Sequence, residues 1–182
     1  KVFESYELID ELPEGEKFYG LDFGFQNDPT ALIEIVEDKQ GNFYFNELIY
    51  QTKLYTVDIA KRMFDMGIKQ DAPIVADNDN RIVESLRNND GTLNNQDAEY
   101  KGIENGFNVY VAHHKDILKR IDKLRGRKLF ITKKSKHLIN EFENYTYQKD
   151  ARTGEYINKP IDNYNHGIDA IGYGIIAKGI YF

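Results

Sequence analysis

The chain has 182 residues, 41% of them hydrophobic and 13% aromatic, and its 30 acidic against 24 basic residues give a formal net charge of −6. This length and aromatic content predict one globular domain and exclude an extended disordered chain. The absence of cysteine excludes disulfide frameworks, thiolate metal sites and thiol nucleophiles, and no run approaches the ~20 consecutive apolar residues that a membrane-spanning helix needs.

The first part of the chain predicts an antiparallel sheet. Alternating apolar residues indicate three consecutive strands, and a polar turn at residues 38–41 joins the second strand to the third. These strands are expected at residues 17–23, 31–37 and 42–51.

Strands and helices alternate in the rest of the chain. Short apolar, β-branched runs predict buried strands, and apolar residues at helical spacing predict the helices. We expect strands at 73–76, 107–112 and 128–131, helices at 56–67, 78–87, 114–125 and 135–145, a polar hairpin at 145–159, and a last helix that Asn165 caps. This order predicts an α/β fold with a mixed sheet. The first strands of the sheet are expected to be antiparallel, and helices are expected to flank both of its faces.

One carboxylate falls inside an apolar strand. Asp22 lies on the same strand face as Gly20 and Gly24, which leave room around it. A buried carboxylate is costly unless it is paired or coordinates a cation. Asp22 is therefore a candidate metal ligand, although a buried Lys or Arg partner is an alternative explanation.

Two further acids occupy positions where ligand sites form. Asp77 ends a buried strand, and Asp169 lies in the first turn of the last helix, three residues after His166 and on the same face. Each also has a structural interpretation: Asp77 can cap the next helix, Asp169 suits a helix N-terminus, and His166 suits a helix-start hydrogen bond.

Three converging carboxylates would repel one another unless a cation lay between them. Oxygen ligands suit Mg²⁺ or Mn²⁺, and two such ions can activate a water and stabilise the leaving oxygen of a phosphodiester. The acids therefore favour metal-dependent phosphodiester hydrolysis.

Three sequence blocks resemble the C-terminal nuclease domain of phage terminase large subunits. They are Gly-Leu-Asp-Phe-Gly-Phe at 20–25 with Asp-Pro-Thr-Ala at 28–31, Ile-Val-Ala-Asp at 74–77, and Asn-His-Gly-Ile-Asp-Ala-Ile-Gly-Tyr at 165–173. The resemblance covers most of the chain and implies an RNase H-like fold. It also implies an endonuclease that cuts concatemeric viral double-stranded DNA during genome packaging.

The resemblance assigns roles to particular residues. It makes Asp22, Asp77 and Asp169 ligands of two Mg²⁺ or Mn²⁺ ions, and His166 a neighbouring ligand or proton-transfer group. Lys115 could contact the scissile phosphate or replace some metal charge, although an exposed solvated lysine is the ordinary explanation. The chain departs from the family pattern at Asp79, an extra carboxylate or a helix cap, and in the long insertion at 88–106.

The resemblance also implies partners. The sequence has no Gly-x-x-x-x-Gly-Lys-Ser/Thr motif, so the packaging ATPase is expected in a preceding domain of the same polypeptide. Residues 1–16 would then be an acidic, solvated linker or N-terminal extension, and residues 17–182 the nuclease domain. The family further implies a terminase small subunit and a portal protein as partners, and the cytoplasm of the infected bacterial host as location.

A basic stretch is a candidate DNA-binding surface despite the negative net charge. Ten basic residues and two acids lie between Lys115 and Lys136. A solvated helix face is the ordinary explanation for such a run. The residues expected to contact DNA are Lys115, Lys119, Arg120, Lys123, Arg125, Arg127 and Lys128.

Two other functions remain open from the sequence. One is a non-catalytic DNA-clamping or motor-docking module that kept the fold without using metals. The other is a different RNase H-like nuclease, such as a junction resolvase, because a shared fold does not fix the substrate.

Overall fold

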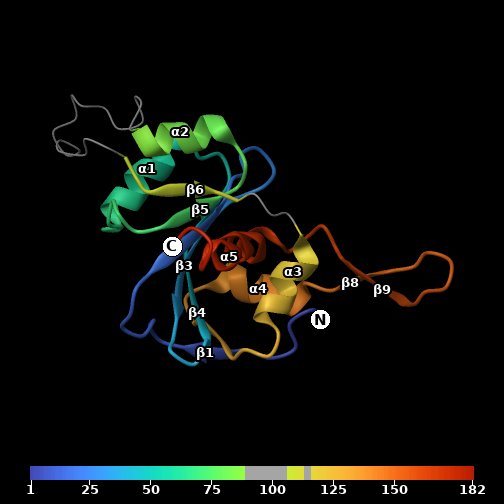
Figure 1. Ribbon diagram of the computed structural model, residues 1–182. Helices are drawn as coiled ribbons and strands as arrows, with labels where there is room; N and C mark the ends of the chain where they lie inside the picture. The colour runs from blue at the N-terminus through green and yellow to red at the C-terminus, as the bar shows by residue number, and fades with distance from the viewer. Residues whose placement is uncertain (89–105, 113–115) are drawn as a thin grey trace.

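The computed structural model describes residues 1–88, 106–112 and 116–182 (Figure 1). Lys115 and nearly all of the predicted insertion at 88–106 lie outside the described residues.

A seven-stranded mixed sheet forms the centre of the fold, in the spatial order β1-β7-β4-β3-β2-β5-β6. β2, β3 and β4 pair antiparallel, as the alternation predicts, and the other neighbours pair parallel. The strands are β1 (Glu7–Ile9), β2 (Phe18–Asp22), β3 (Thr30–Glu37), β4 (Phe43–Gln51), β5 (Ile74–Ala76), β6 (Val109–Val111) and β7 (Leu129–Thr132).

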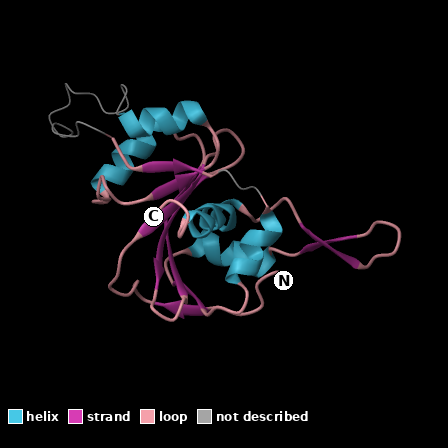
Figure 2. Cartoon of the chain, in the orientation of Figure 1, coloured by secondary structure: helices cyan, strands magenta, loops and turns pink. Residues whose placement is uncertain are grey.

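Helices cover both faces of the sheet (Figure 2). Side chains of α1 and α2 belong to one apolar cluster with one face of the strands, and those of α3, α4 and α5 belong to a second cluster with the other face. The helices are α1 (Thr56–Asp65), α2 (Asn80–Asn88), α3 (Ile117–Leu124), α4 (Lys136–Asn144) and α5 (His166–Ala177). The predicted α/β class and the mixed, two-sided sheet are confirmed.

α5 approaches the sheet closely at Gly20. A Cβ atom at this position would lie only 1.7 Å from the carbonyl oxygen of Ala170 on α5. The room that the sequence indicated beside Asp22 is therefore occupied by the helix backbone. This close approach brings the first turns of α5 next to the end of β2.

The N-terminal segment packs against the domain, in contrast to the solvated connector expected from its acids. Val2 and Phe3 are buried, and the Phe3 ring stacks on Phe142 of α4 at 5.0 Å between centroids. The amide of Val2 donates to the carbonyl of Tyr145, and β1 pairs with β7 as an edge strand. The apolar residues at positions 2 and 3 outweigh the acidic composition, because their burial removes large side chains from water.

The predicted hairpin is present and projects beyond the helices (Figure 1). It consists of β8 (Tyr147–Lys149) and β9 (Tyr156–Pro160), which pair antiparallel. Among the described helices, none is long and apolar enough to cross a membrane.

Candidate active site

Asp22 and Asp77 lie side by side at the carboxyl end of the sheet. Asp22 is the last residue of β2, and Asp77 directly follows β5, the parallel neighbour of β2. The amide of Asp77 donates to the carbonyl of Leu21 at 3.1 Å, which fixes the two residues next to each other. Neighbouring strands lie about 4.8 Å apart, so the two carboxylates share one small region.

α5 brings three more polar side chains to Asp22. The Tyr173 hydroxyl donates to Oδ1 of Asp22 at 3.3 Å, and Nδ1 of His166 lies 3.4 Å from Oδ2. Asp169 lies close enough to feel the charge of Asp22, because burial and then repulsion from Asp22 raise the pKa of Asp169. The helix therefore assembles a polar cluster around an acid of the neighbouring strand.

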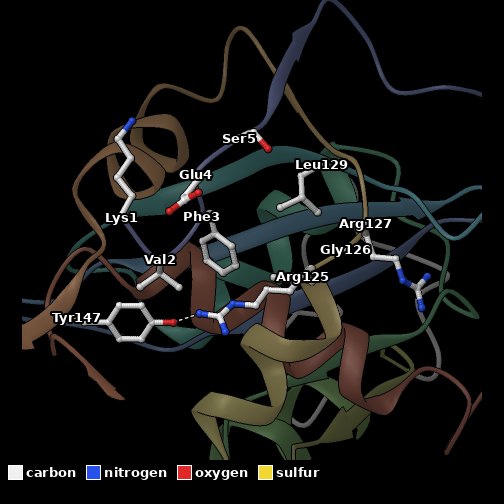
Figure 3. Close-up of a pocket in the computed structure, with 11 residues that line it drawn as sticks. Lys1, Val2, Phe3, Glu4, Ser5, Arg125, Gly126, Arg127, Leu129 and Tyr147 are labelled. Atoms are coloured by element: carbon white, nitrogen blue, oxygen red, sulfur yellow. Dashed lines mark hydrogen bonds between the residues drawn. The ribbon is translucent and has the colours of Figure 1, made fainter. Parts of the chain in front are cut away.

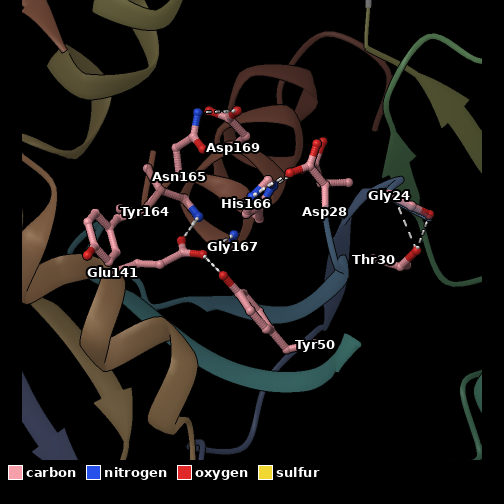
Figure 4. A network of polar contacts seen from close by, with 12 residues as sticks. Gly24, Asp28, Thr30, Tyr50, Glu141, Tyr164, Asn165, His166, Gly167 and Asp169 are labelled. Atoms are coloured by element: carbon pink, nitrogen blue, oxygen red, sulfur yellow. Dashed lines mark hydrogen bonds and ion pairs between the residues drawn. The ribbon is translucent and has the colours of Figure 1, made fainter. Parts of the chain in front are cut away.

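His166 lies between the carboxylates of Asp22 and Asp28, and Figure 4 shows it beside Asp28. Its Nε2 is 3.6 Å from Oδ1 of Asp28, in the loop between β2 and β3, while its Nδ1 faces Asp22. The hydrogen bond that His166 donates to Asp22 raises the pKa of His166 above its ordinary value, against the opposing effect of burial. His166 is thus held in a position where it can carry a proton or a positive charge.

The loop that carries Asp28 has a defined shape (Figure 4). The amide of Gly24 donates to the Thr30 hydroxyl at 3.3 Å, and that hydroxyl donates to the Gly24 carbonyl at 3.1 Å. A Cβ at Gly24 would lie 2.2 Å from the carbonyl oxygen of Asp28, so glycine is required for the chain to fold back here. This turn explains the spacing between Asp22 and Asp28.

Asp169 is held by an arginine and an amide. Nη1 of Arg120, on α3, lies 3.4 Å from Oδ1 of Asp169, and Nδ2 of Asn165 donates to Oδ2 at 3.4 Å. The guanidinium of Arg120 also lies over the Tyr173 ring, 4.7 Å from its centroid. The Arg120 side chain is only 7% exposed, so it serves the acidic cluster and does not form part of an exposed DNA-binding surface.

Burial and mutual proximity raise the pKa values of two acids in the cluster. Burial raises the pKa of Asp22, and the neighbouring Asp77 adds to this effect while His166 opposes it. Burial and the charge of Asp22 raise the pKa of Asp169 to about 7, despite the opposing charge of Arg120. Ionised oxygens of this kind gain most from a nearby cation.

The carboxylate oxygens are suitable ligands for a hard divalent ion, but they do not form a complete coordination site. Among the described residues, no group of three or more His, Cys, Asp or Glu side chains could hold a metal ion in the present arrangement. The contacts are pairwise, with Asp22 facing His166 and Asp169 facing Arg120. Asp22 and Asp77 are the pair best suited to bind a divalent ion, because Mg²⁺ and Mn²⁺ accept adjacent oxygen ligands.

We expect the metal-free protein to lose stability as the pH rises from about 4 to 7. The folded Asp169 keeps its proton up to a pKa of about 7, whereas the unfolded chain releases it near the ordinary value of 3.8. The folded state therefore binds more protons in this window, and the free energy of unfolding falls by up to ~1.4 kcal/mol per pH unit. Urea unfolding in EDTA should show this slope, and Asp169→Asn should flatten it. An equal slope in the variant would contradict the assignment.

Glu141 is a buried acid that the sequence interpretation missed. It is 1% exposed, lies on α4, and both of its oxygens face the start of α5. A signal was present in the sequence, because Glu141 shares the inward helix face of Leu138, Phe142 and Tyr145. A charged residue on that face requires buried partners.

The remaining basic residues predicted to bind DNA divide into two groups. Arg125 donates to the Tyr147 hydroxyl, and Arg127 donates to the Gly41 carbonyl at 2.7 Å, so both guanidiniums hold parts of the domain together. The second group is exposed and consists of Lys119, Lys123 and Lys128. Arg125 and Arg127 are exposed as well, so all five side chains reach the surface.

A separate hollow lies beside Arg125 and the N-terminal segment (Figure 3). Val2, Phe3 and Tyr147 also line it. None of the acids of the β2 and β5 cluster lines this hollow, so it is distinct from the chemical site.

Comparisons with known proteins identify the family of the chain. The family model described as the terminase RNase H-like domain matches residues 22–176. The large terminase subunit of Bacillus phage SPP1 is 30% identical over 161 residues, which are 85% of this chain and 34% of that protein. The chain thus spans about a third of the length of this curated relative.

Solved structures show the same fold. The nuclease domain of the phage SPP1 large terminase, crystallised with bound Mn, has a TM-score of 0.76 and 21% identity, with 97% of this chain and 98% of that chain covered. The P22 large terminase nuclease domain has a TM-score of 0.68 and 16% identity, with 98% and 92% covered. The RNase H-like fold is thereby confirmed, and the chain belongs to the family of terminase RNase H-like domains.

Proposed function

We propose that this chain is the nuclease domain of a phage terminase large subunit, a metal-dependent endonuclease that cuts concatemeric viral double-stranded DNA during packaging. One observation carries the proposal: Asp22 and Asp77 are adjacent at the carboxyl ends of parallel strands, and α5 places His166 against Asp22. Family membership and the bound Mn of the SPP1 domain support it.

The proposed cofactors are two Mg²⁺ or Mn²⁺ ions, held by Asp22, Asp77 and Asp169 with His166 beside them. When bound, such ions activate water and stabilise the leaving 3′-oxygen. Asp22 would be the shared ligand, since it lies between the other groups. Asp169 would bring a carboxylate that Arg120 and Asn165 already hold in place. His166, held at both ring nitrogens, is placed to move a proton.

The exposed lysines are proposed to hold the DNA backbone. Lys119, Lys123 and Lys128 belong to the predicted stretch, as do Lys133 and Lys134 in the turn between β7 and α4 and Lys136 at the start of α4. Contacts between aromatic rings link the start of α4 to the acidic cluster. The exposed His137 stacks on Tyr50 at 4.5 Å, and the Tyr50 ring meets His166 edge-on at 6.4 Å.

Removing two of these lysines tests the DNA surface. We expect the double variant Lys134→Gln, Lys136→Gln to bind duplex DNA more weakly and to lower the slope of log Kd against log salt by about 2, roughly one for each lost phosphate contact. Fluorescence anisotropy across a salt series measures both. The matched double variant Lys39→Gln, Lys69→Gln removes two exposed lysines elsewhere and should keep the parental slope. Equal slopes in all three proteins would place the DNA elsewhere.

The same proposal extends to the rest of the packaging machine. We infer that an ATPase domain in the same polypeptide drives the DNA, and that a terminase small subunit and a portal protein are partners. The host cytoplasm is the corresponding location.

Binding of Mn²⁺ tests the metal site without relying on cleavage. We expect Mn²⁺ to raise the melting temperature, because a ligand that binds only the folded state stabilises it by about 2.7 kcal/mol at a hundredfold excess over Kd. Asp77→Ala should remove most of this stabilisation and abolish cleavage of plasmid DNA in Mn²⁺. If Mn²⁺ leaves the melting temperature of the parent chain unchanged, the result would instead favour the non-catalytic clamping or docking module.

Substrate choice is tested separately. Linear duplex, branched DNA and RNA–DNA hybrid offered at equal concentration distinguish a packaging nuclease from another RNase H-like enzyme. The proposal expects duplex DNA to be cut, and a strict requirement for branched DNA would reject it.

A further inference from the structure

Glu141 forms a buried junction between α4, α5 and β4 (Figure 4). Its Oε2 accepts the amide N–H of Gly167 at 3.1 Å and the hydroxyl of Tyr50 at 2.6 Å. Its Oε1 accepts the amide N–H of Ile168 at 3.0 Å. Three donors from two other elements therefore meet on one carboxylate that is nearly inaccessible to solvent.

The Glu141 carboxylate caps the N-terminus of α5, although Glu141 belongs to another helix. The first amides of a helix have no partner within it, and the helix dipole favours a negative charge at that end. Asn165 stands at the cap position, but its side chain makes no capping bond and instead donates to Asp162 and Asp169. Glu141 supplies the acceptors that Asn165 does not.

The turn that Glu141 holds is the turn that carries two residues of the proposed site. His166 and Asp169 flank the two bonded amides along α5. The other side of this helix is fixed by its contact with β2 at Gly20. The Tyr50 hydroxyl joins the same carboxylate to β4, next to the ring of His166. α5 is thus held between Glu141 behind it and the strand that ends at Asp22 in front.

We propose that Glu141 is a positioning residue that fixes the first turn of α5, and with it His166 and Asp169, against Asp22. This inference rests on the proposed function, because it concerns the same metal site. Glu141 touches neither substrate nor ion. It acts through α5, and its loss weakens the binding of divalent ions by letting Asp169 and His166 move away from Asp22.

Glu141→Gln is the sharpest test, because glutamine keeps the shape but replaces one acceptor oxygen by an amide donor. We expect the Mn²⁺ concentration for half-maximal plasmid cleavage to rise by about 10-fold or more, as removal of a group that orients ligands usually does. The rate at saturating Mn²⁺ should recover toward the parental value. Calorimetric titration with Mn²⁺ should show the same loss of affinity.

Glu143→Gln is the matched control. Glu143 lies on the same helix but is exposed and paired with Lys1 and Tyr6. Its substitution should leave the Mn²⁺ dependence unchanged. Tyr50→Phe removes one of the three donors and keeps the other two, so we expect a smaller shift in the same direction, about 2- to 5-fold.

The outcomes separate the inference from the proposed function. A lower melting temperature with parental Mn²⁺ dependence in Glu141→Gln would show a purely structural role and overturn the inference. If that variant fails to fold, an unchanged Mn²⁺ dependence in Tyr50→Phe would overturn it. A parent chain that binds Mn²⁺ but cuts no DNA rejects the proposed function alone, and calorimetry then decides the role of Glu141. A parent chain that binds no Mn²⁺ overturns both.

Discussion

Asp22→Asn is expected to reduce metal-dependent plasmid cleavage by at least about 100-fold while the domain stays folded. Asparagine has the same shape as aspartate but carries no charge. It therefore removes a buried carboxylate whose pKa is raised by burial and by the neighbouring Asp77. The metal-free variant should therefore be at least as stable as the parent. Plasmid nicking in Mn²⁺ and thermal melting in EDTA measure the two quantities.

The control for this prediction is an aspartate of the same chain outside the site. Asp71 is exposed, and Asp71→Asn should cut DNA at the parental rate. Cleavage by Asp22→Asn at a rate comparable with this control would remove Asp22 from the metal site. Loss of cleavage together with loss of folded structure would instead assign Asp22 a structural role.

Gly20→Ala is expected to have the second largest effect, on both stability and metal binding. The added Cβ would lie 1.7 Å from the backbone oxygen of Ala170, and a backbone atom cannot rotate away. α5 must then move outward, which costs about 1–3 kcal/mol as overpacking does and separates Asp169 from Asp22. Urea unfolding gives the free energy, and Mn²⁺-dependent melting gives the response to metal.

Gly179→Ala separates strain from displacement of α5. Gly179 has a positive φ of 88° and no atom within 4 Å of the added Cβ. This variant should lose about 1 kcal/mol through backbone strain and keep the parental response to Mn²⁺. A parental response in Gly20→Ala as well would show that the contact between α5 and β2 does not set the geometry of the site.

Local sequence patterns predicted most of the secondary structure. The strands of the antiparallel part were expected within one residue at each end of β2, β3 and β4. β5, β7 and the helices followed from short β-branched runs and helical spacing. β1 was missed, because Glu7 and the neighbouring Asp10 suggest solvent exposure. Only pairing with β7 gives this segment its structure.

The basic residues show where composition fails. Arg120 and Lys119 are neighbours in the sequence, yet one is buried against Asp169 and the other is exposed. Arg127 supports the turn at Gly41, far away in the sequence. A count of positive charges cannot separate these roles, because the direction of each side chain depends on how α3 packs against α5.

The sequence by itself determined the α/β order of elements and the identity of the candidate acids, because periodicity and an acid within an apolar strand are local properties. Only the tertiary structure decided which groups meet. The parallel pairing of β2 with β5, the approach of α5 at Gly20, and the partners of Arg120 and Glu141 all join residues far apart in the chain. Such contacts depend on packing between elements, and no local pattern of residue types encodes them.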